Sequence, residues 1–164
     1  MAVDGSAVSY RIGLGVDAHA LEPGVPLVLG GVTLDHPTGL AGHSDGDVLA
    51  HALIDALLGA AGLGDIGSLF PSGDESLRGA SSIDLLVEAY RQVTEAGWHL
   101  VNADCILIGE EPKIAEHRAE MRECLSKAVN GAEVNVRATT TDHLGFTGRQ
   151  EGLAAQAVAL LERS

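Results

Sequence analysis

The segment over residues 44–61 constrains the fold of this chain more than any other part of the sequence. At about 100° of rotation per residue in a helix, its apolar side chains point in nearly every direction. One narrow polar stripe around His51 interrupts them. The residues within about 40° of His51 are Ser44, Asp47, Asp55 and the apolar Leu58. A helix of this kind is buried on several sides. In a short chain, part of that burial could come from another subunit.

The length of the chain fits a single domain. It has 164 residues, and domains typically run to about 100–200 residues. Apolar residues make up 46% of the chain and charged residues 20%, which is typical of an ordered globular protein. No apolar run approaches the roughly 18 residues that span a bilayer. We expect residues 10–164 to form one catalytic domain. Residues 1–9 lack the apolar core of a signal peptide, and we expect them to be a disordered extension. The expected location is cytoplasmic.

The charge balance narrows the class of ligand. Ten Lys and Arg residues stand against 23 Asp and Glu residues, which gives a formal net charge of −13, and aromatic residues make up only 3%. Nucleic-acid binding needs a basic patch or an aromatic stacking platform, so the composition argues against it. An acidic protein that binds phosphate must use metal ions, backbone amides or helix ends. Cys105 and Cys124 lack the paired spacing of a disulfide scaffold or a cysteine zinc site.

Strand and helix patterns alternate along the chain. Apolar periodicity and end signals predict helices over 44–61, 81–96, 111–129 and 148–162. Strands are predicted over 10–16, 98–108 and 134–141, with a short strand or hairpin over 26–34 that Gly30 and Gly31 interrupt. This order predicts an α/β or α+β fold in which helices cover one mixed sheet.

Asp17 and His19 form the first arm of a candidate metal site. Residues two apart on a strand share one face, so this carboxylate and imidazole point the same way. His51 adds a second imidazole, although a lone histidine on an apolar helix is more often a core residue. Two histidines and one carboxylate are a common catalytic zinc set with one open position, and imidazoles favour zinc or a neighbouring transition metal. Either Asp47 or Asp55 is expected to orient His51.

Two other segments carry groups that suit phosphate. Ser44 and Asp47 have the spacing of a capping box. The free amides at that helix end would also bind an anion, with His43 beside them as a hydrogen-bond donor. Residues 145–149 offer a turn, a hydroxyl and an arginine at a predicted helix start.

Residues 13–18 match the G-x-G-x-x-A pattern of dinucleotide-binding folds. Those folds also have an acidic residue farther along the chain, and Asp35 stands at about the expected distance. That pattern must open a helix. The Glu-Pro-Gly run at 22–24 leaves room for barely one turn, so we expect a strand here and no dinucleotide site.

Several longer motifs point to one family. They lie, in order, at residues 11–19, 41–47, 63–71, 111–113 and 138–149. From about Arg11 to its C-terminus the chain resembles the 2-C-methyl-D-erythritol 2,4-cyclodiphosphate synthases. The resemblance implies a CMP-releasing lyase of the non-mevalonate route to isoprenoid precursors, which cyclises 4-diphosphocytidyl-2-C-methyl-D-erythritol 2-phosphate. It also implies a homotrimer with active sites between subunits, one zinc ion per subunit, and magnesium or manganese bound with the substrate.

The resemblance further implies roles for individual residues. The zinc ligands of the family match Asp17, His19 and His51, and the acid that holds the second ion matches Asp142. The positions credited with transition-state stabilisation match His43 and Thr140, and the cytidine pocket matches residues 109–115. The substrate contacts of the family fall on Asp17, Ala18, His19, His43, Ser44, Asp65, Ile66, Gly67, Phe70, Pro71, Ser72, Gly73, Asp74, Gly109, Glu110, Glu111, Pro112, Lys113, Ile114, Ala115, Thr139, Thr140, Thr141, Asp142, Phe146 and Arg149.

Two positions depart from the family pattern, and two other functions stay open. Asp142 stands where the family usually has Glu, and Ser72 stands where many members have Asp. The same metal set would also serve a zinc-dependent phosphate-ester or diphosphate hydrolase, with Asp65 as the candidate general base. A non-enzymatic nucleotide-binding module, resting on residues 13–18 and 111–113, is the remaining alternative.

Overall fold

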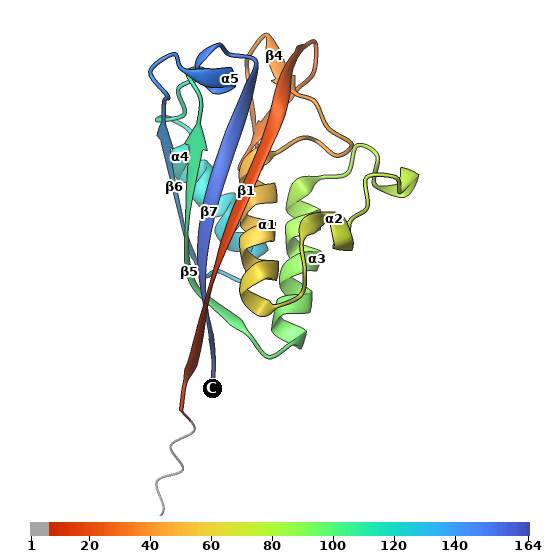
Figure 1. Ribbon diagram of the computed structural model, residues 1–164, viewed down its shortest axis with the longest axis vertical. Helices are drawn as coiled ribbons and strands as arrows, with labels where there is room; N and C mark the ends of the chain where they lie inside the picture. The colour runs from red at the N-terminus through yellow and green to blue at the C-terminus, as the bar shows by residue number, and fades with distance from the viewer. Residues whose placement is uncertain (1–6) are drawn as a thin grey trace, which may run out of the picture.

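A computed structural model describes residues 7–164, which form a mixed sheet with helices packed on one face (Figure 1). The sheet has five strands in the order β4 (Thr38–Leu40), β1 (Ser9–Pro23), β7 (Gly152–Arg163), β5 (His99–Ile108) and β6 (Glu133–Thr139). β5 and β6 are parallel, and every other neighbouring pair is antiparallel. β2 (Leu27–Leu29) and β3 (Val32–Leu34) form a separate hairpin. The predicted α+β fold with one mixed sheet is therefore confirmed.

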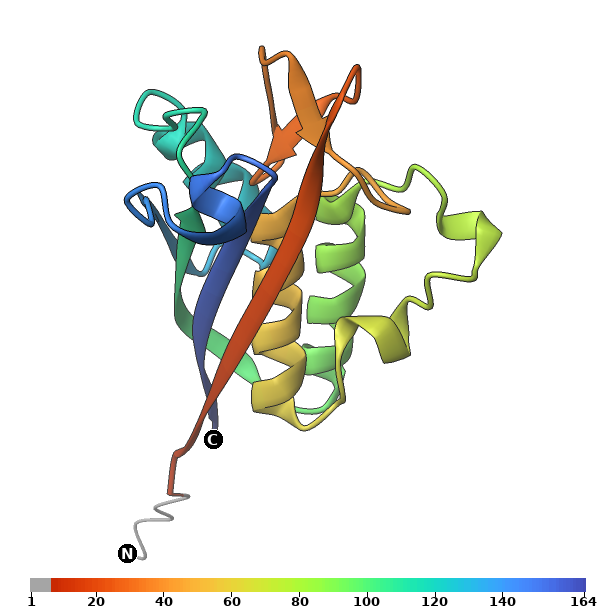
Figure 2. The same cartoon turned by 45° about the horizontal axis from the view of Figure 1, so that its top comes forward.

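The longest helices lie on the same side of the sheet. They are α1 (Val48–Ala61), α3 (Ser82–Glu95) and α4 (Arg118–Ala128), and the short elements are α2 (Ile66–Leu69), α5 (Gly145–Gly148) and a 3-10 turn, η1 (Glu75–Leu77). Figure 2 shows α1 between the sheet and α3, with the segment that carries α2 and η1 projecting to one side. Of the 14 residues of α1, 12 are buried. The prediction of a helix buried on several sides is confirmed, and elements of the same chain supply that burial.

Two glycines let β1 lie directly against α1. A Cβ atom at Gly13 would stand 2.0 Å from the carbonyl oxygen of Ala56, and one at Gly15 would stand 1.8 Å from that of Ala52. No side chain fits at such a distance from the backbone of a helix. The G-x-G pattern therefore serves close packing inside a strand, and it opens no helix.

The helix predicted over 148–162 is wrong, because most of this segment is β7, which pairs with both β1 and β5. Its burial alternates as in a strand: one face is buried against α1, and Gln156 and Val158 are exposed on the other. Alanine-rich sequences favour helices, but long-range pairing overrides that weak preference. The small side chains of β7 instead leave room for α1.

The other predicted elements hold with shifted ends. The helix predicted over 111–129 begins only at Arg118, because residues 109–117 form a loop whose Ile114 is buried in the core. The helix predicted over 44–61 begins at Val48. The helix over 81–96 is confirmed as α3, with Ser81 as its N-cap, and the hairpin over 26–34 is confirmed as β2 and β3.

The predicted N-terminal extension lies partly outside the described residues, which begin at residue 7, and β1 starts at Ser9. The single domain over 10–164 stays a prediction. Within residues 7–164, no helix has both the length and the apolar character required to cross a membrane.

Candidate active site

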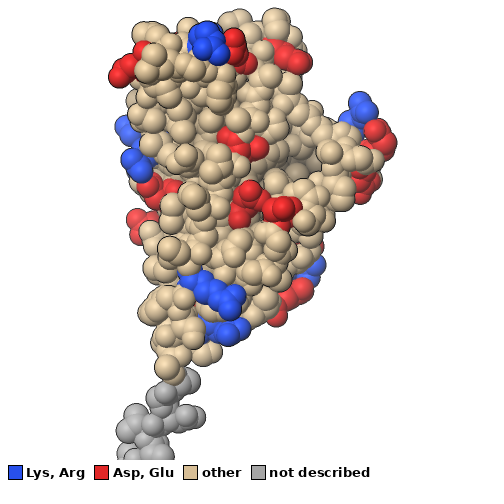
Figure 3. Space-filling model, viewed as in Figure 1, with Lys and Arg blue, Asp and Glu red and all other residues tan. Residues whose placement is uncertain are grey.

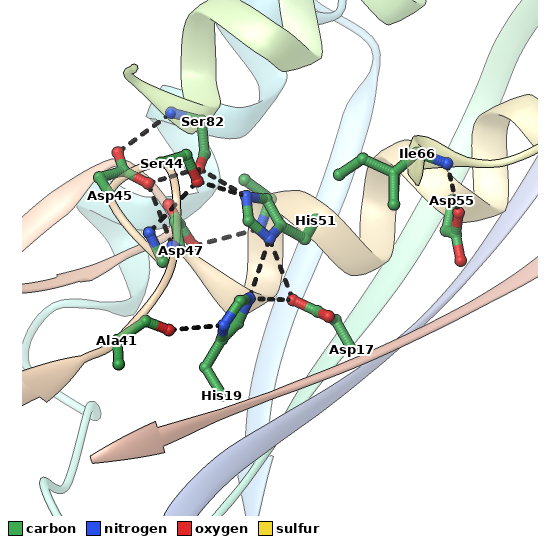
Figure 4. A network of polar contacts seen from close by, with 12 residues as sticks. Asp17, His19, Ala41, Ser44, Asp45, Asp47, His51, Asp55, Ile66 and Ser82 are labelled. Atoms are coloured by element: carbon green, nitrogen blue, oxygen red, sulfur yellow. Dashed lines mark hydrogen bonds and ion pairs between the residues drawn. The ribbon is translucent and has the colours of Figure 1, made fainter. Parts of the chain in front are cut away.

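Asp17 and His19 of β1 meet His51 of α1 at one point (Figure 4). Oδ2 of Asp17 lies 2.8 Å from Nε2 of His19 and 3.1 Å from Nδ1 of His51, and the two ring nitrogens lie 3.1 Å apart. The odd-numbered residues of β1 face α1, so the strand that brings Gly13 and Gly15 against the helix also aims the two side chains at His51. The structure thus brings together the three residues proposed from the sequence as metal ligands.

The surroundings of His19 fix which of its nitrogens carries hydrogen. Nδ1 of His19 lies 2.7 Å from the carbonyl oxygen of Ala41. A carbonyl oxygen only accepts hydrogen bonds, so Nδ1 donates. In a neutral imidazole the other nitrogen is then unprotonated, and the lone pair of Nε2 points at Asp17 and His51.

The same reasoning applies to His51. Its Nε2 lies 2.8 Å from the hydroxyl oxygen of Ser82, whose own hydrogen is donated to the carboxylate of Asp45. The hydroxyl oxygen therefore accepts from Nε2, and Nδ1 of the neutral ring is left with a lone pair. When both rings are neutral, the atoms of Asp17, His19 and His51 that face one another are therefore all acceptors.

A divalent cation satisfies this arrangement. Zinc ligands stand about 2.0–2.2 Å from the ion, so two ligand atoms in a tetrahedral site are about 3.3–3.6 Å apart. The three separations, 2.8, 3.1 and 3.1 Å, are somewhat shorter than that spacing, so a bound ion would require the side chains to move slightly apart. The three residues therefore fit a divalent metal ion.

The carboxyl group of Asp17 is held ionised. Its partial burial acts to raise its pKa, but hydrogen bonds and charge from His19 and His51 outweigh burial and lower the pKa to about 2. The pKa of His19 is raised, chiefly by its hydrogen bond to Asp17. A negative charge therefore remains at the centre of the cluster across the physiological pH range, as a cation site requires.

The cluster forms one wall of a cavity of about 420 Å³. Among the residues named from the sequence, the cavity is lined by Asp17, His19, His43, Ser44, His51, Ile66, Gly67, Phe70, Pro71, Ser72 and Gly73. Leu77 and Leu85 also line it and carried no signal in the sequence. Nε2 of His43 donates to the carbonyl oxygen of Asp74 at 2.8 Å. The cavity thus combines a candidate cation site, imidazole donors and an apolar wall.

Three residues expected to contact substrate stand apart from this cavity within the chain. The side chain of Ala18 is on the opposite face of β1, because neighbouring residues of a strand alternate. The carboxylate of Asp65 caps α2 and accepts from the backbone N–H and the hydroxyl of Ser68, both at 2.7 Å. Asp74 likewise caps η1 and accepts from Ser76.

The remaining predicted residues gather elsewhere. Residues 112–115 line a separate hollow of about 210 Å³ together with Arg118 and Ala138. Thr140, Asp142, Phe146 and Arg149 are exposed around α5. The buried carboxylate of Glu110 accepts from the backbone N–H of His143 at 3.0 Å, which fastens this turn to the loop over 109–117. Among residues 7–164, none lines both the cavity and the hollow.

The N-terminus of α1, predicted as an anion site, is capped by a carboxylate of the chain itself. Asp47 is itself the N-cap, and its buried carboxylate accepts from the backbone N–H groups of Gly30 at 2.9 Å, Gly31 at 2.7 Å and Ala50 at 3.1 Å. Asp47 thus caps the helix, as its position in the sequence suggests, but it is the N-cap itself, so Ser44 is not the cap of a capping box. A carboxylate already occupies this helix end, and burial raises the pKa of Asp47 to about 6.

Neither acid expected to orient His51 does so. The carboxylate of Asp47 bonds to the three amides just described, and that of Asp55 accepts from the backbone N–H of Ile66 at 2.9 Å. Ser82 and Ser44 stand beside Nε2 of His51 instead, at 2.8 and 3.1 Å. Ser44 belongs to the polar stripe predicted from the sequence, whereas Ser82 comes from α3, so the periodicity of the segment over 44–61 did not indicate it.

One face of the molecule carries acidic side chains at its centre. On the face of residues 7–164 drawn in Figure 3, Asp and Glu side chains occupy the centre, while Lys and Arg side chains stand mostly towards the margins. A phosphate group that approached this face would meet negative charge. A bound cation would offset it.

Comparisons with known proteins agree with this geometry. The model of the YgbB family matches residues 10–162. A 2-C-methyl-D-erythritol 2,4-cyclodiphosphate synthase from Rubrobacter xylanophilus is 59% identical over 160 residues, which cover 94% of this chain and 96% of that protein.

Two solved structures are similar in fold. IspF of Plasmodium falciparum, in a complex with CDP, has a TM-score of 0.82 and 30% identity, with coverage of 95% of this chain and 97% of that chain. The bifunctional IspDF of Campylobacter jejuni has a TM-score of 0.92 and 41% identity. The match covers 96% of this chain but only 43% of the bifunctional one.

Proposed function

The chain belongs to the YgbB family, and from this membership we propose that it acts as a 2-C-methyl-D-erythritol 2,4-cyclodiphosphate synthase in the non-mevalonate route to isoprenoid precursors. The substrate is 4-diphosphocytidyl-2-C-methyl-D-erythritol 2-phosphate. An oxygen of its 2-phosphate attacks the β-phosphorus, the bond from that phosphorus to the bridging oxygen breaks, and CMP leaves with the bond's electron pair. The attacking group belongs to the substrate, so no side chain needs to act as a nucleophile.

The observation that carries the proposal is the convergence of three potential ligand atoms, from Asp17, His19 and His51, at the wall of a cavity. We propose that they hold one zinc ion, since one carboxylate and two imidazoles are a zinc donor set that leaves a position open. Such an ion acts as a Lewis acid toward a phosphate oxygen and offsets the charge of the two reacting phosphates.

The residues around the cluster position the substrate. The N–H of His43 now bonds to the carbonyl oxygen of Asp74, and a rotation of the side chain would redirect it to a phosphate oxygen in the cavity. Ile66 and Phe70 offer apolar surface to the carbon chain of the methylerythritol. Phosphoryl transfer depends mainly on alignment and charge neutralisation, and correct orientation alone lowers barriers by up to about 7–11 kcal/mol in model reactions.

The cytidine half of the substrate and a second ion are assigned to the residues around the hollow at 112–115 and around α5. We propose that residues 109–115, with Lys113 among them, bind the cytidine. Thr140 stabilises the transition state, and Asp142 helps to hold a magnesium or manganese ion that arrives with the substrate. The bond from His143 to Glu110 supports this grouping, because it joins the turn that carries Asp142 to the proposed cytidine loop. Asp142 is a methylene shorter than the usual Glu, so its contact to the ion is expected to pass through water.

We propose that the chain works as a homotrimer whose active sites lie between copies. Two observations support this. The cavity at Asp17 and the hollow at residues 112–115 share no lining residue among those described. On the outer face of the sheet, Ile12, Leu14 and Val16 are 75%, 65% and 54% exposed, an apolar strip suited to burial against another copy. Sedimentation should give three times the chain mass, and Leu14→Asp should lower it; a monomer at micromolar wild-type concentration would refute the trimer.

The reaction is tested by incubating the purified chain with the cytidyl substrate in water enriched in oxygen-18. Phosphorus NMR should detect a cyclic diphosphate and CMP in equal amounts, and mass spectrometry should find no label in the cyclic product. Label in an acyclic product would instead identify a hydrolase. Asp65 gives that alternative little support, since it caps α2 and does not line the cavity.

Two further points stay predictions. Binding of CMP in calorimetry without turnover of the substrate would favour the nucleotide-binding module over the synthase. The cytoplasmic location stays a prediction, which a fractionation experiment would test.

A further inference from the structure

A buried hydroxyl lies directly behind the candidate metal cluster. Ser82, the first residue of α3, is fully buried, and its oxygen lies 2.8 Å from Nε2 of His51. The hydroxyl of Ser44 lies farther from the same nitrogen, at 3.1 Å. Figure 4 shows that these contacts are on the side of the ring opposite Asp17 and His19.

Asp45 determines the direction of the hydrogen bond between Ser82 and His51. Its Oδ2 accepts from the backbone N–H of Ser82 at 3.0 Å, and its Oδ1 accepts from that of Asp47 at 3.1 Å. Oδ1 also accepts the hydroxyl hydrogen of Ser82. Because that single hydrogen is committed to Asp45, the hydroxyl oxygen has only lone pairs to offer the ring.

We propose that Asp45 and Ser82 are positioning residues that hold the ring hydrogen of His51 on Nε2 and so keep Nδ1 unprotonated toward Asp17 and His19. The inference rests on the proposed metal site and adds Ser82 and Asp45 to it; Asp45 lies in the motif over residues 41–47, but the sequence indicated no role for it. A ring hydrogen on Nδ1 would point into the cluster and block metal binding. Groups that orient a metal-bound histidine in this way typically change metal affinity about 10–100-fold when removed.

The backbone around the pair is held independently of the hydroxyl. The N–H of Gly79 donates to the carbonyl oxygen of His43 at 2.8 Å, and the N–H of Asp45 donates to that of Ala80 at 3.1 Å. These bonds tie the segment before α1 to the segment before α3. Removal of the Ser82 hydroxyl therefore alters the polar contact to His51 while the two segments stay joined.

The first test measures the tautomer in metal-free protein. Histidine labelled with nitrogen-15 reports which ring nitrogen carries hydrogen, and the signals of His51 are assigned by their loss in His51→Gln. At about pH 8.5, roughly 2 units above the ordinary histidine pKa, wild type should carry the hydrogen on Nε2. In Ser82→Ala and Asp45→Asn it should move substantially to Nδ1. The Asn amide would donate to Ser82, which frees the hydroxyl hydrogen for Nε2.

The second test measures zinc affinity by competition with a chelating dye. Ser82→Ala and Asp45→Asn should weaken zinc binding about 10–100-fold, and Ser82→Thr, which keeps the hydroxyl, should restore the wild-type tautomer. Ser81→Ala is the matched control, because it removes a neighbouring hydroxyl that caps α3 and bonds to Asp84. It should leave both the tautomer and the affinity unchanged.

The outcomes separate this inference from the proposed function. A Ser82→Ala protein with the wild-type tautomer and wild-type zinc affinity would overturn the positioning role. Failure of the wild type to bind zinc would overturn the metal site, and the metal-free tautomer would still decide whether Ser82 and Asp45 fix His51. If Ser82→Ala does not fold, the isosteric Asp45→Asn tests the positioning role instead, by the same measurements of the His51 tautomer and of zinc affinity.

Discussion

The carboxylate of Asp55 accepts a hydrogen bond from the backbone N–H of Ile66 at 2.9 Å, and this contact fastens the cavity loop to α1. Asp55 lies on the same helix as His51, one turn farther along. The segment over residues 66–73, which begins with α2, supplies much of the cavity wall. One side chain therefore joins the proposed substrate-binding segment to the helix that carries a proposed ligand.

Asp55→Ala should raise the KM for the cytidyl substrate by a factor of roughly 2–10, the equivalent of one lost hydrogen bond of about 0.5–1.5 kcal/mol. Zinc content should stay at the wild-type level, since Asp55 does not contact the cluster. Steady-state kinetics with metal analysis checks both. Asp35→Ala removes an exposed acid after β3 and is the control; an unchanged KM in Asp55→Ala would contradict the prediction.

His51→Ala should lower bound zinc and reduce CMP release by at least about 100-fold, because it removes a direct ligand where loss of an orienting group alone costs about 10–100-fold. Elemental analysis and a CMP assay measure the two effects. His99→Ala, at an exposed histidine at the start of β5, should match wild type in both. Full zinc content with normal turnover in His51→Ala would remove the basis for the metal assignment.

The buried carboxyl of Asp47 should make stability depend on pH. Burial raises its pKa to about 6 in the folded chain, from an ordinary value of 3.8. The folded state therefore binds the proton more tightly than the unfolded state, so this group's contribution to stability falls as pH rises from about 4 to about 6. Urea titrations give the free energy of unfolding of wild type and of Asp47→Asn at each pH. The value for wild type minus the value for Asp47→Asn should decline over this range. A difference that is flat with pH would contradict the prediction.

Gly13→Ala should destabilise the fold by about 3 kcal/mol or more, since overpacking against rigid backbone exceeds the usual 1–3 kcal/mol cost. The new Cβ would stand 2.0 Å from the carbonyl oxygen of Ala56. Gly59→Ala is the matched control, because that glycine lies in α1 with open space around it, and the change should stabilise the helix by about 0.5–1 kcal/mol. Thermal unfolding compares the two; similar melting temperatures would argue against the close packing of β1 on α1.

The local patterns of the sequence predicted the parts of the fold that depend on one segment at a time. The all-round apolar character of α1 predicted its burial, and Ser81 marked the start of α3. The two-residue spacing of Asp17 and His19 on a predicted strand placed both on one face. Their meeting with His51 could be proposed because each residue type suits the same ion.

Other features depend on contacts between distant segments, and the sequence gave no local sign of them. β7 is rich in alanine on both faces, so the alternation that marks a strand is visible only in its burial. Ser82 approaches His51 across 31 positions of the chain. The loop over 109–117 interrupts a helical pattern because Ile114 packs into the core, which no helical periodicity reveals.

The placement of Gly13, Gly15, Asp17 and His19 on a single face of β1 makes ion binding a reporter of strand register. A slip by one position would turn both ligands outward and drive Leu14 and Val16 into the backbone of α1, since neighbouring residues alternate between faces. A correctly paired strand and a complete ligand set therefore arise together. Uptake of one ion per chain by the refolded protein would thus serve as a check that the sheet has assembled in its native alignment.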